Sequence, residues 1–235
     1  MDQINKIRTL SLWIFILPIV VLNLCLFITI NSHLLDNTIF TVDWNGRSSF
    51  TIPYIDGGLS ISRTARTYPT YLLFKPCMII TGILLFKYWI KTNDLMQNHN
   101  NQVKKNNFFT FGILSAIFLI CHSILLGTSF DFDFYKIFRR IVLICFIIFE
   151  VMAQTLFVIQ LYKNKNKISK IINERILYLK IVLVSILCIV AVASLPILTS
   201  PENTAFKHIL EWNYFIGIIL FYFLTFCFWR KKKKT

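Results

Sequence analysis

Residues 50–75 read FTIPYIDGGLSISRTARTYPTYLLFK, a polar stretch that runs directly into an apolar block. Its Gly-Gly pair allows a sharp turn because glycine lacks a Cβ atom. Hydroxyl groups and two permanently charged guanidinium groups follow closely. These residue types suit a phosphate or another anionic group, and the alternative is a solvated loop that covers a helix bundle. The residues of this stretch that we predict to contact an anionic group are Asp56, Ser60, Ser62, Arg63 and Arg66.

The rest of the chain is dominated by apolar blocks of about 20 residues, the length that crosses the hydrocarbon core of a bilayer. Of the 235 residues, 56% are hydrophobic, whereas soluble domains have roughly 45–50%. We therefore expect an all-α integral membrane protein, a bundle of six transmembrane helices in one domain, residues 1–235. The predicted helices cover residues 10–30, 71–90, 108–129, 137–162, 176–198 and 208–229.

The distribution of charge predicts the orientation in the membrane. The net charge of +14 is high enough for a nucleic-acid-binding protein. With the N-terminus placed inside, however, 17 lysines and arginines fall on the inner side and 8 on the outer side. Cytoplasmic loops carry such an excess, so we expect both termini in the cytoplasm and no nucleic-acid partner. The inner charges also suit anionic lipids.

The six cysteines all fall within predicted helices. Their spacing fits neither a disulfide framework nor a metal site. We therefore expect small core side chains, with no bound metal and no cofactor.

The longest connection, residues 31–69, carries signals of β-structure. Residues 38–44 and 48–52 are rich in β-branched and aromatic side chains, and Asn45-Gly46 between them favours a two-residue type I′ turn. We predict a small β-hairpin in this first extracytoplasmic loop. Because a lone hairpin is marginal in water, it should lie on the helix ends, and residues 56–68 should cross the mouth of the bundle.

Three ionisable side chains within the predicted helices are candidates for general acid/base catalysis, because such groups are costly inside a bilayer. His122 lies about 10 Å below the outer end of its helix. Glu150 lies near mid-membrane, on one helix face with Arg139 and Gln154. Glu211 lies one turn inside the last helix. The alternatives are a packing role for His122, a protonated bridge between two helices for Glu150, and helix capping for Glu211.

Basic residues at the same depth complete the predicted outer site. Lys75, Arg139 and Arg140 lie in one layer with His122 and Glu211, below the loop quoted above. We expect these three basic residues to contact the head group of a membrane lipid. For Lys75, snorkelling to the interface is the alternative.

Three landmarks together resemble a known family. They are PYIDGGLSIS at 53–62 with YPTYLLF at 68–74, SFDF at 129–132, and ILEW at 209–212 with FLTF at 223–226. On these residues the chain resembles the six-helix Frag/DRAM/Sfk superfamily. Its branches are the damage-regulated autophagy modulators, the second post-GPI-attachment-to-proteins factor and the Sfk-type yeast proteins. The resemblance covers almost the whole chain. It departs in the fourth helix, where the GPI factor has a histidine and this chain has Glu150 and Gln154.

The resemblance implies remodelling of a lipid head group or a GPI-type lipid anchor in the ER or Golgi membrane. From its autophagy branch it implies instead a lysosomal or endosomal regulator without established chemistry. The ending Lys231–Thr235 fits a dilysine retrieval signal in a eukaryote, and it also fits an ordinary stop-transfer run. The composition indicates an AT-rich genome, which equally fits a bacterium. The protein would then lie in the plasma membrane.

Three function classes remain open. In the first, an enzyme exchanges an acyl chain or head group, although the sequence has no His-x4-Asp pair and no Gly-x-Ser-x-Gly elbow. In the second, a non-catalytic protein senses or presents lipid, or acts as an adaptor for other membrane proteins. A transporter is third, because the two halves of the sequence show no internal repeat. The expected partners are membrane lipids and, second, other membrane proteins.

Overall fold

The fold is all-helical over the residues that the computed structural model describes, namely 2–100, 106–126, 133–169, 171–199 and 202–230. These ranges contain no β-strand. The helices are α1 (Asp2–Ile30), α2 (Ile61–Arg66), α3 (Thr70–Asn100), α4 (Asn107–Leu125), α5 (Asp133–Lys163), α6 (Lys165–Ile168), α7 (Glu174–Ala193), α8 (Leu195–Thr199) and α9 (Thr204–Phe228), with short 3-10 helices at Ser32–Leu35 and Trp44–Gly46.

Six of these helices are long and apolar enough to cross a membrane: α1, α3, α4, α5, α7 and α9. This confirms the prediction of a multi-pass integral membrane protein. In the most apolar part of each helix, only 22–44% of the residues are buried inside the protein. Most of the apolar side chains therefore face outward, as they do on a bundle that is surrounded by lipid.

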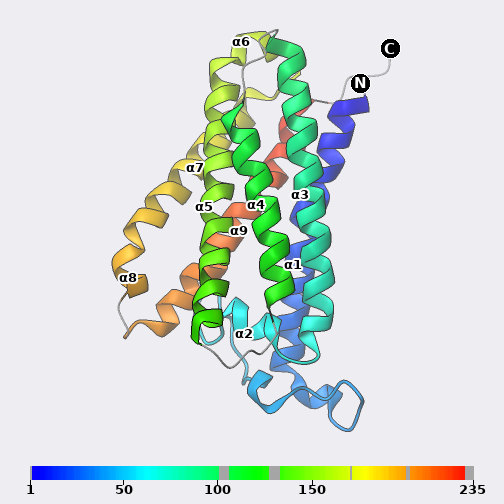
Figure 1. Ribbon diagram of the computed structural model, residues 1–235, viewed down its shortest axis with the longest axis vertical. Helices are drawn as coiled ribbons and strands as arrows, with labels where there is room; N and C mark the ends of the chain where they lie inside the picture. Colours follow the sequence, from blue (N-terminus) through cyan, green and yellow to red (C-terminus); the bar gives the residue numbers. More distant parts are fainter. Residues whose placement is uncertain (1, 101–105, 127–132, 170, 200–201, 231–235) are drawn as a thin grey trace.

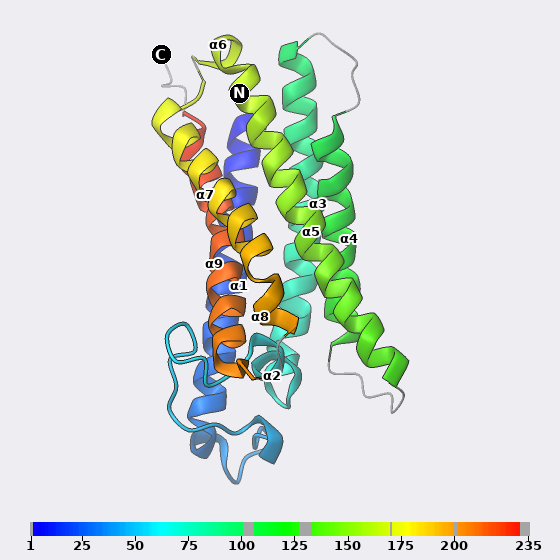
Figure 2. The same ribbon diagram turned by 90° about the vertical axis from the view of Figure 1, so that its left-hand side faces the viewer.

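The six long helices form one bundle (Figures 1 and 2). Around it, α1 packs between α9 and α3, α4 packs between α3 and α5, and α7 packs on both α5 and α9. We call the end where α1 begins and α9 finishes the terminal end, and the end that carries residues 31–69 the loop end. Helices α5 and α9 touch at few positions, and in Figure 2 they diverge toward the loop end.

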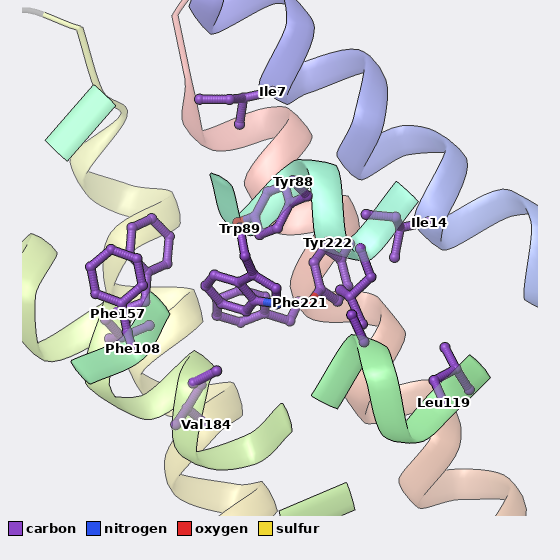
Figure 3. Close-up of a cluster of buried hydrophobic side chains, with 14 of the residues drawn as sticks. Ile7, Ile14, Tyr88, Trp89, Phe108, Leu119, Phe157, Val184, Phe221 and Tyr222 are labelled. Carbon is purple, nitrogen blue, oxygen red and sulfur yellow. The ribbon is translucent and has the colours of Figure 1, made fainter. Parts of the chain in front are cut away.

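Large aromatic side chains fill the bundle toward its terminal end. We call this set the aromatic layer: Tyr88, Trp89, Phe108, Phe157, Phe221 and Tyr222, each at most 1% exposed. Figure 3 shows that they converge from α3, α4, α5 and α9. A Cβ atom on Gly112 would lie 2.4 Å from the Trp89 ring. The layer is therefore packed so closely that α4 needs glycine at this position.

Backbone pairing closes the terminal end. Ile172 and Trp229 form an antiparallel bridge, and the backbone amide of Asn173 donates to the carbonyl of Phe228 at 2.8 Å. The guanidinium of Arg8 on α1 donates to the carbonyl of Trp229. Together these bonds tie α1, the chain before α7 and the end of α9 into one cap.

The predicted β-hairpin in residues 38–52 is wrong. Neither Asn45 nor Gly46 has the positive φ that a type I′ turn requires, and both lie in a 3-10 turn. The backbone groups of the expected strands bond elsewhere, because the amide of Asp43 donates to the carbonyl of Tyr68 and the amide of Ser48 to that of Thr29. Tertiary contacts with the ends of α1 and α3 have thus overridden the local β-propensity.

Candidate functional site

A largely apolar cavity of about 140 Å³ extends from the loop end into the middle of the bundle. Its described lining residues come from α1, α2, α3, α4, α5, α9 and the residue that follows α4, with none from α7 or α8. An engineered apolar cavity of about 150 Å³ holds one benzene molecule. The space therefore accepts a short length of hydrocarbon chain but not a whole lipid.

The cavity brings together the three residues predicted to act as acids or bases. His122 on α4, Glu150 on α5 and Glu211 on α9 all line it. Glu150 lies at the deep end, beside Tyr222 of the aromatic layer, whereas Glu211 lies beside α2 at the loop end. An otherwise apolar wall thus has ionisable groups at both of its ends.

Glu150 is 1% exposed and is held by side chains from three helices. Ser115 Oγ donates to its Oε2 at 2.7 Å, Gln154 Nε2 donates to its Oε1 at 2.8 Å, and the hydroxyl of Tyr222 also donates to Oε1. A buried carboxyl was expected to have partners, and those of Glu150 are neutral hydrogen-bond donors. Sequence reasoning missed Ser115 and Tyr222, because they come from other helices and no local pattern marks them.

His122 is 91% buried, since 9% of its surface is exposed. Its Nδ1 atom has no hydrogen-bond partner among the residues that the structure describes. The neighbouring Ser123 hydroxyl is directed to the carbonyl of Leu119 at 2.7 Å, so it is not available to His122 as a nucleophile. Buried polar atoms in native proteins are mostly paired, so the unpaired Nδ1 of a residue that lines the cavity is a candidate contact for a ligand.

Glu211 holds α2 across the loop end of the cavity. Its carboxyl faces the backbone amides of Ile61 and Ser62, the first two residues of α2. A carboxylate is favourable at a helix N-terminus, so Glu211 does act as a cap, but of α2 rather than of its own helix.

The start of α9 also binds the loop that precedes α2. The indole of Trp212 donates to the carbonyl of Leu59, and Asn213 Nδ2 donates to the carbonyl of Tyr54, each at 2.8 Å. Gly57 has a φ of +64°, and a Cβ atom there would lie 1.9 Å from the carbonyl oxygen of Ala205. The Gly-Gly turn is thus required for the loop to reach α9.

Two of the residues predicted to contact an anionic group instead shape the loop. The carboxylate of Asp56 accepts from the Thr51 hydroxyl at 2.6 Å and from the amides of Ile52 and Gly58 at 2.7 and 2.9 Å. These donors hold the pKa of Asp56 below its ordinary value. The side chain of Ser60 caps α2 by accepting from the amide of Arg63 at 3.1 Å.

The guanidinium of Arg63 is directed to the backbone of the long loop. Its Nε donates to the carbonyl of Asn45 at 3.1 Å, and its second nitrogen lies 3.5 Å from the carbonyl of Arg47. Arg63 therefore fastens α2 to the 3-10 turn at residues 44–46, and less of its donor capacity is left for a ligand.

Arg66 and Arg139 do not line the cavity, but Arg139 lies near enough to act electrostatically on both Arg66 and the cavity residue His122. Partial burial and the positive charges of Arg139 and Arg63 lower the pKa of Arg66. The charge of Arg139 also acts on His122. Among the described residues, neither Arg66 nor Arg139 forms an ion pair with a carboxylate. Clustered guanidinium groups without a counter-ion repel one another, and an anion between them would relieve that repulsion.

The other predicted residues differ in their relation to the cavity. Ser62 lines it. Lys75 lies outside the lining, with its ammonium 5.6 Å from the ring centre of Tyr71 on its own helix, and Arg140 is exposed. The landmark SFDF at 129–132 and the basic ending at 231–235 lie outside the described residues.

The site is thus an apolar cavity lined by one imidazole and two carboxyl groups and covered by α2, with Arg139 close enough to act on the imidazole. No protein-family model matches this chain, and no curated protein or solved structure matches it either.

Proposed function

We propose that this protein binds a membrane lipid with an anionic head group at its loop end. Arg66 and Arg139 contact the head group, and the first part of one acyl chain occupies the cavity. The observation that carries the proposal is that two arginines, unpaired with any carboxylate among the described residues, act on each other, and that Arg139 also acts on His122 of the cavity wall. An amphiphile with a negative head satisfies both features at once.

The acyl chain reaches the cavity from the membrane between α5 and α9. These helices diverge toward the loop end (Figure 2), and each contributes partly exposed residues to the lining, Leu143 and Phe146 on α5 and Tyr214 on α9. Helix α7 packs on both α5 and α9 but does not line the cavity. A cavity of about 140 Å³ takes only part of a chain, so the remainder lies between α5 and α9.

Within this proposal the protein also helps to remodel the bound lipid. His122 and Glu211 both line the cavity, and the Nδ1 of His122 is unpaired among the described residues, so a lipid ester in the cavity would have an acid/base group near it. A GPI-type anchor on the extracytoplasmic or lumenal side is the substrate that the resemblance to the Frag/DRAM/Sfk superfamily implies. The compartment is then the ER or Golgi membrane in a eukaryote.

A non-catalytic lipid sensor or adaptor is the second candidate. The observation in its favour is that, within the described part of the chain, no hydroxyl or thiol is hydrogen-bonded to His122. Activated nucleophiles are held by such a bond in most acyl-transfer enzymes. Binding without chemistry would use the same cavity and the same arginines.

Native mass spectrometry with lipid identification tests the binding step. We compare wild type with Arg139→Ala and with Arg140→Ala, its exposed neighbour, which removes the same charge from the same helix. A charge-assisted hydrogen bond contributes about 1.5–3 kcal/mol, so Arg139→Ala should retain the lipid roughly 10- to 100-fold less, and Arg140→Ala should behave like wild type. Equal retention in all three proteins contradicts the proposal.

A second measurement separates remodelling from binding alone. Wild type and His122→Gln, in vesicles that contain the retained lipid with a labelled acyl chain, are assayed for release or transfer of the label. Turnover by wild type that is lost in His122→Gln, while the lipid is still retained, supports the enzyme. Retention without turnover in wild type supports the sensor or adaptor.

A further inference from the structure

A segment of the long loop lies against the outside of the bundle, apart from the cavity. Residues 50–55 read FTIPYI and contain no charged residue. None of these six residues lines the cavity. Phe50 is 80% exposed, Ile52 is 45% exposed and Ile55 is 75% exposed. Three apolar side chains within six residues therefore face away from the protein, in a part of the chain that is not a membrane-spanning helix.

The first attachment of this segment is to α1. The hydroxyl of Tyr54 donates to Asn23 Oδ1 at 3.2 Å. Asn23 in turn donates through Nδ2 to the carbonyl of Ile19, one turn earlier in α1, at 2.9 Å. The side-chain amide of Asn23 thus bonds both to the loop and to its own helix. Because Asn23 is exposed, the loop meets α1 on its outer surface.

The part of α1 that carries Asn23 faces the lipid. Its neighbours Val20, Leu24 and Phe27 are all exposed. Positions that differ by three, four and seven lie on one face of an α-helix, and α1 is long and apolar enough to cross a membrane. An exposed apolar face on such a helix contacts acyl chains. Tyr54 therefore bonds to α1 on its lipid-facing side.

The second attachment is to α9. Asn213 Nδ2 donates to the carbonyl of Tyr54 at 2.8 Å, and the ring of Tyr54 packs edge-on against that of Trp212, with 4.9 Å between the ring centres. Figure 2 shows a loop of this part of the chain beside the start of α9. Tyrosine and tryptophan are enriched at the boundary between lipid and water. The two attachments hold Tyr54 between α1 and α9.

The two asparagines indicate the depth of the segment in the membrane. Asn23 lies seven residues before the end of α1, which is about 10 Å along the helix. Asn213 lies nine residues after the start of α9, which is about 13 Å. Helix α9 has 25 residues and is about 37 Å long, only a little more than the hydrocarbon core of about 30 Å. Tyr54 therefore lies at the level of the lipid leaflet at the loop end rather than beyond it.

The backbone of the segment is adapted to an apolar environment. Inside a bilayer, backbone polar groups need partners within the protein. The amide of Ile52 donates to the carboxylate of Asp56 at 2.7 Å, and the amide of Ile55 donates to the carbonyl of Ile52 at 2.8 Å. Pro53 has no amide hydrogen to satisfy. These bonds close a turn at residues 52–56 that can enter the boundary of the bilayer without leaving these donors unpaired.

We propose that residues 50–55 are an interfacial membrane anchor, which inserts Phe50, Ile52 and Ile55 among the lipids of the leaflet at the loop end. Interfacial segments bury their apolar side about 5–10 Å into the boundary between head groups and acyl chains. The chain continues from this segment through the Gly-Gly turn into α2, so the cover of the cavity is attached to the bilayer as well as to α9. This inference goes beyond the proposed function and does not depend on a ligand in the cavity.

Photo-cross-linking of the wild-type protein tests the anchor. The protein is placed in phosphatidylcholine vesicles that contain a small amount of phosphatidylcholine with a diazirine near the carbonyl end of one acyl chain, and the labelled residues are mapped by mass spectrometry. Residues 50–55 should be labelled as strongly as residues 20–27 of α1. Residues 43–47, which include Asp43 and Arg47, should be labelled roughly 10-fold less, the ratio by which burial favours one large apolar side chain over water.

Labelling of residues 20–27 without labelling of residues 50–55 overturns the proposal, because the purified protein has no other partner in these vesicles. The exposed apolar side chains of the segment would then form a surface for another protein.

A charge placed on the segment gives an independent test. Ile55→Asp should lower the melting temperature in the same vesicles by about 5 °C, because a carboxylate is unfavourable among acyl chains. Ile39→Asp is the matched control, since Ile39 is 82% exposed in the same loop but lies outside the segment, and it should melt like wild type. Equal melting temperatures for all three proteins contradict the anchor. If Ile55→Asp does not fold, the cross-linking of wild type decides.

Discussion

The two halves of the bundle are filled in opposite ways. At the terminal half, aromatic side chains from four helices meet, a lysine is enclosed by three rings, and backbone bonds close the end. At the loop half, the same bundle encloses a cavity of about 140 Å³, lined in part by His122, whose Nδ1 is unpaired among the described residues. The terminal half fills its space with rings, whereas the loop half leaves space that a ligand can occupy.

This difference follows from helix geometry rather than from composition. Apolar side chains line both halves, but α5 and α9 diverge toward the loop end, and α2 covers the space between the helices without filling it. Protein interiors are normally packed to the density of organic crystals. A void that α2 and the loop before it keep open therefore indicates a binding site rather than imperfect packing. The four predictions below test this difference.

The largest effect is expected when the packed half loses a ring. Phe221 is 0% exposed and contacts Lys180, Phe157 and Tyr222. Phe221→Ala should destabilise the protein by about 3–5 kcal/mol, because a buried ring and its cation contact are lost together. Thermal unfolding in detergent should show the melting temperature about 10 °C lower.

The control is Phe86→Ala, which removes the same ring from a side chain that is 37% exposed on α3. A loss as large as that of Phe221→Ala would mean that the aromatic layer is no more important than the membrane-facing surface. That result would break the distinction between the two halves.

A smaller effect is expected where the loop is fastened to α9. Gly57→Ala places a Cβ atom 1.9 Å from the carbonyl oxygen of Ala205 and strains a φ of +64°. The strain alone costs about 1–3 kcal/mol, so the loop should detach and the cavity should lose its cover. Hydrogen exchange of residues 54–62 should rise and lipid retention should fall, while the exchange of the aromatic layer should stay unchanged.

Gly58→Ala is the matched control one residue away. Its φ is not positive, and its added Cβ atom meets the side-chain hydroxyl of Thr51 at 2.5 Å, so it costs at most the one hydrogen bond of Thr51 to Asp56 and should raise exchange less than Gly57→Ala does. If the two variants exchange equally fast, the close approach of Gly57 to α9 is not what holds the loop.

Filling the cavity should change ligand binding more than stability. Leu119 is 3% exposed and lines the cavity from α4. Leu119→Trp should change the free energy of unfolding by roughly 1 kcal/mol, because the added ring enters existing space. The same variant should lose the retained lipid in native mass spectrometry. Ile117→Trp, at a membrane-facing position that is 44% exposed, should keep it.

The six spans were predictable from sequence because a bilayer imposes length and apolarity on each helix separately. The loop was not, because its hydrogen bonds depend on tertiary partners. Asn45-Gly46 is a strong local signal for a hairpin, yet Arg63 and Tyr68 bond to the backbone on either side of the turn and hold it in another form. Local propensity decides only where nothing from elsewhere competes.

The candidate site was predictable as a set of residue types but not as an arrangement. His122, Glu150 and Glu211 stood out because ionisable groups are costly in a membrane, and the fold places all three on one cavity. The cavity itself depends on how the helices diverge, which no single helix encodes. Lys180 has the appearance of an ordinary lysine near a helix end, and only its three surrounding rings show that it is buried.

The smallest effect is expected from pH at the loop. The Thr51 hydroxyl and the two backbone amides that donate to Asp56 lower its pKa. Because the folded-state pKa lies below the unfolded value of about 3.9, this carboxylate stabilises the loop fully above that value. The stabilisation is lost as the pH falls through the folded pKa. Hydrogen exchange of residues 51–59, corrected for the intrinsic rate at each pH, should therefore rise only below about pH 4.

Asp56→Asn tests whether this carboxylate, rather than another acid of the loop, causes the transition. The amide oxygen can accept fewer of the three donors and does not titrate, so the loop should exchange faster at neutral pH and lose its acid transition. Asp36→Asn, which removes an acid that pairs with Arg47 at 2.6 Å elsewhere in the same loop, should keep the transition. If the transition persists in Asp56→Asn, another group controls the loop. The contacts from α9, Trp212 to Leu59 and Asn213 to Tyr54, would then fasten the cover of the cavity more than Asp56 does.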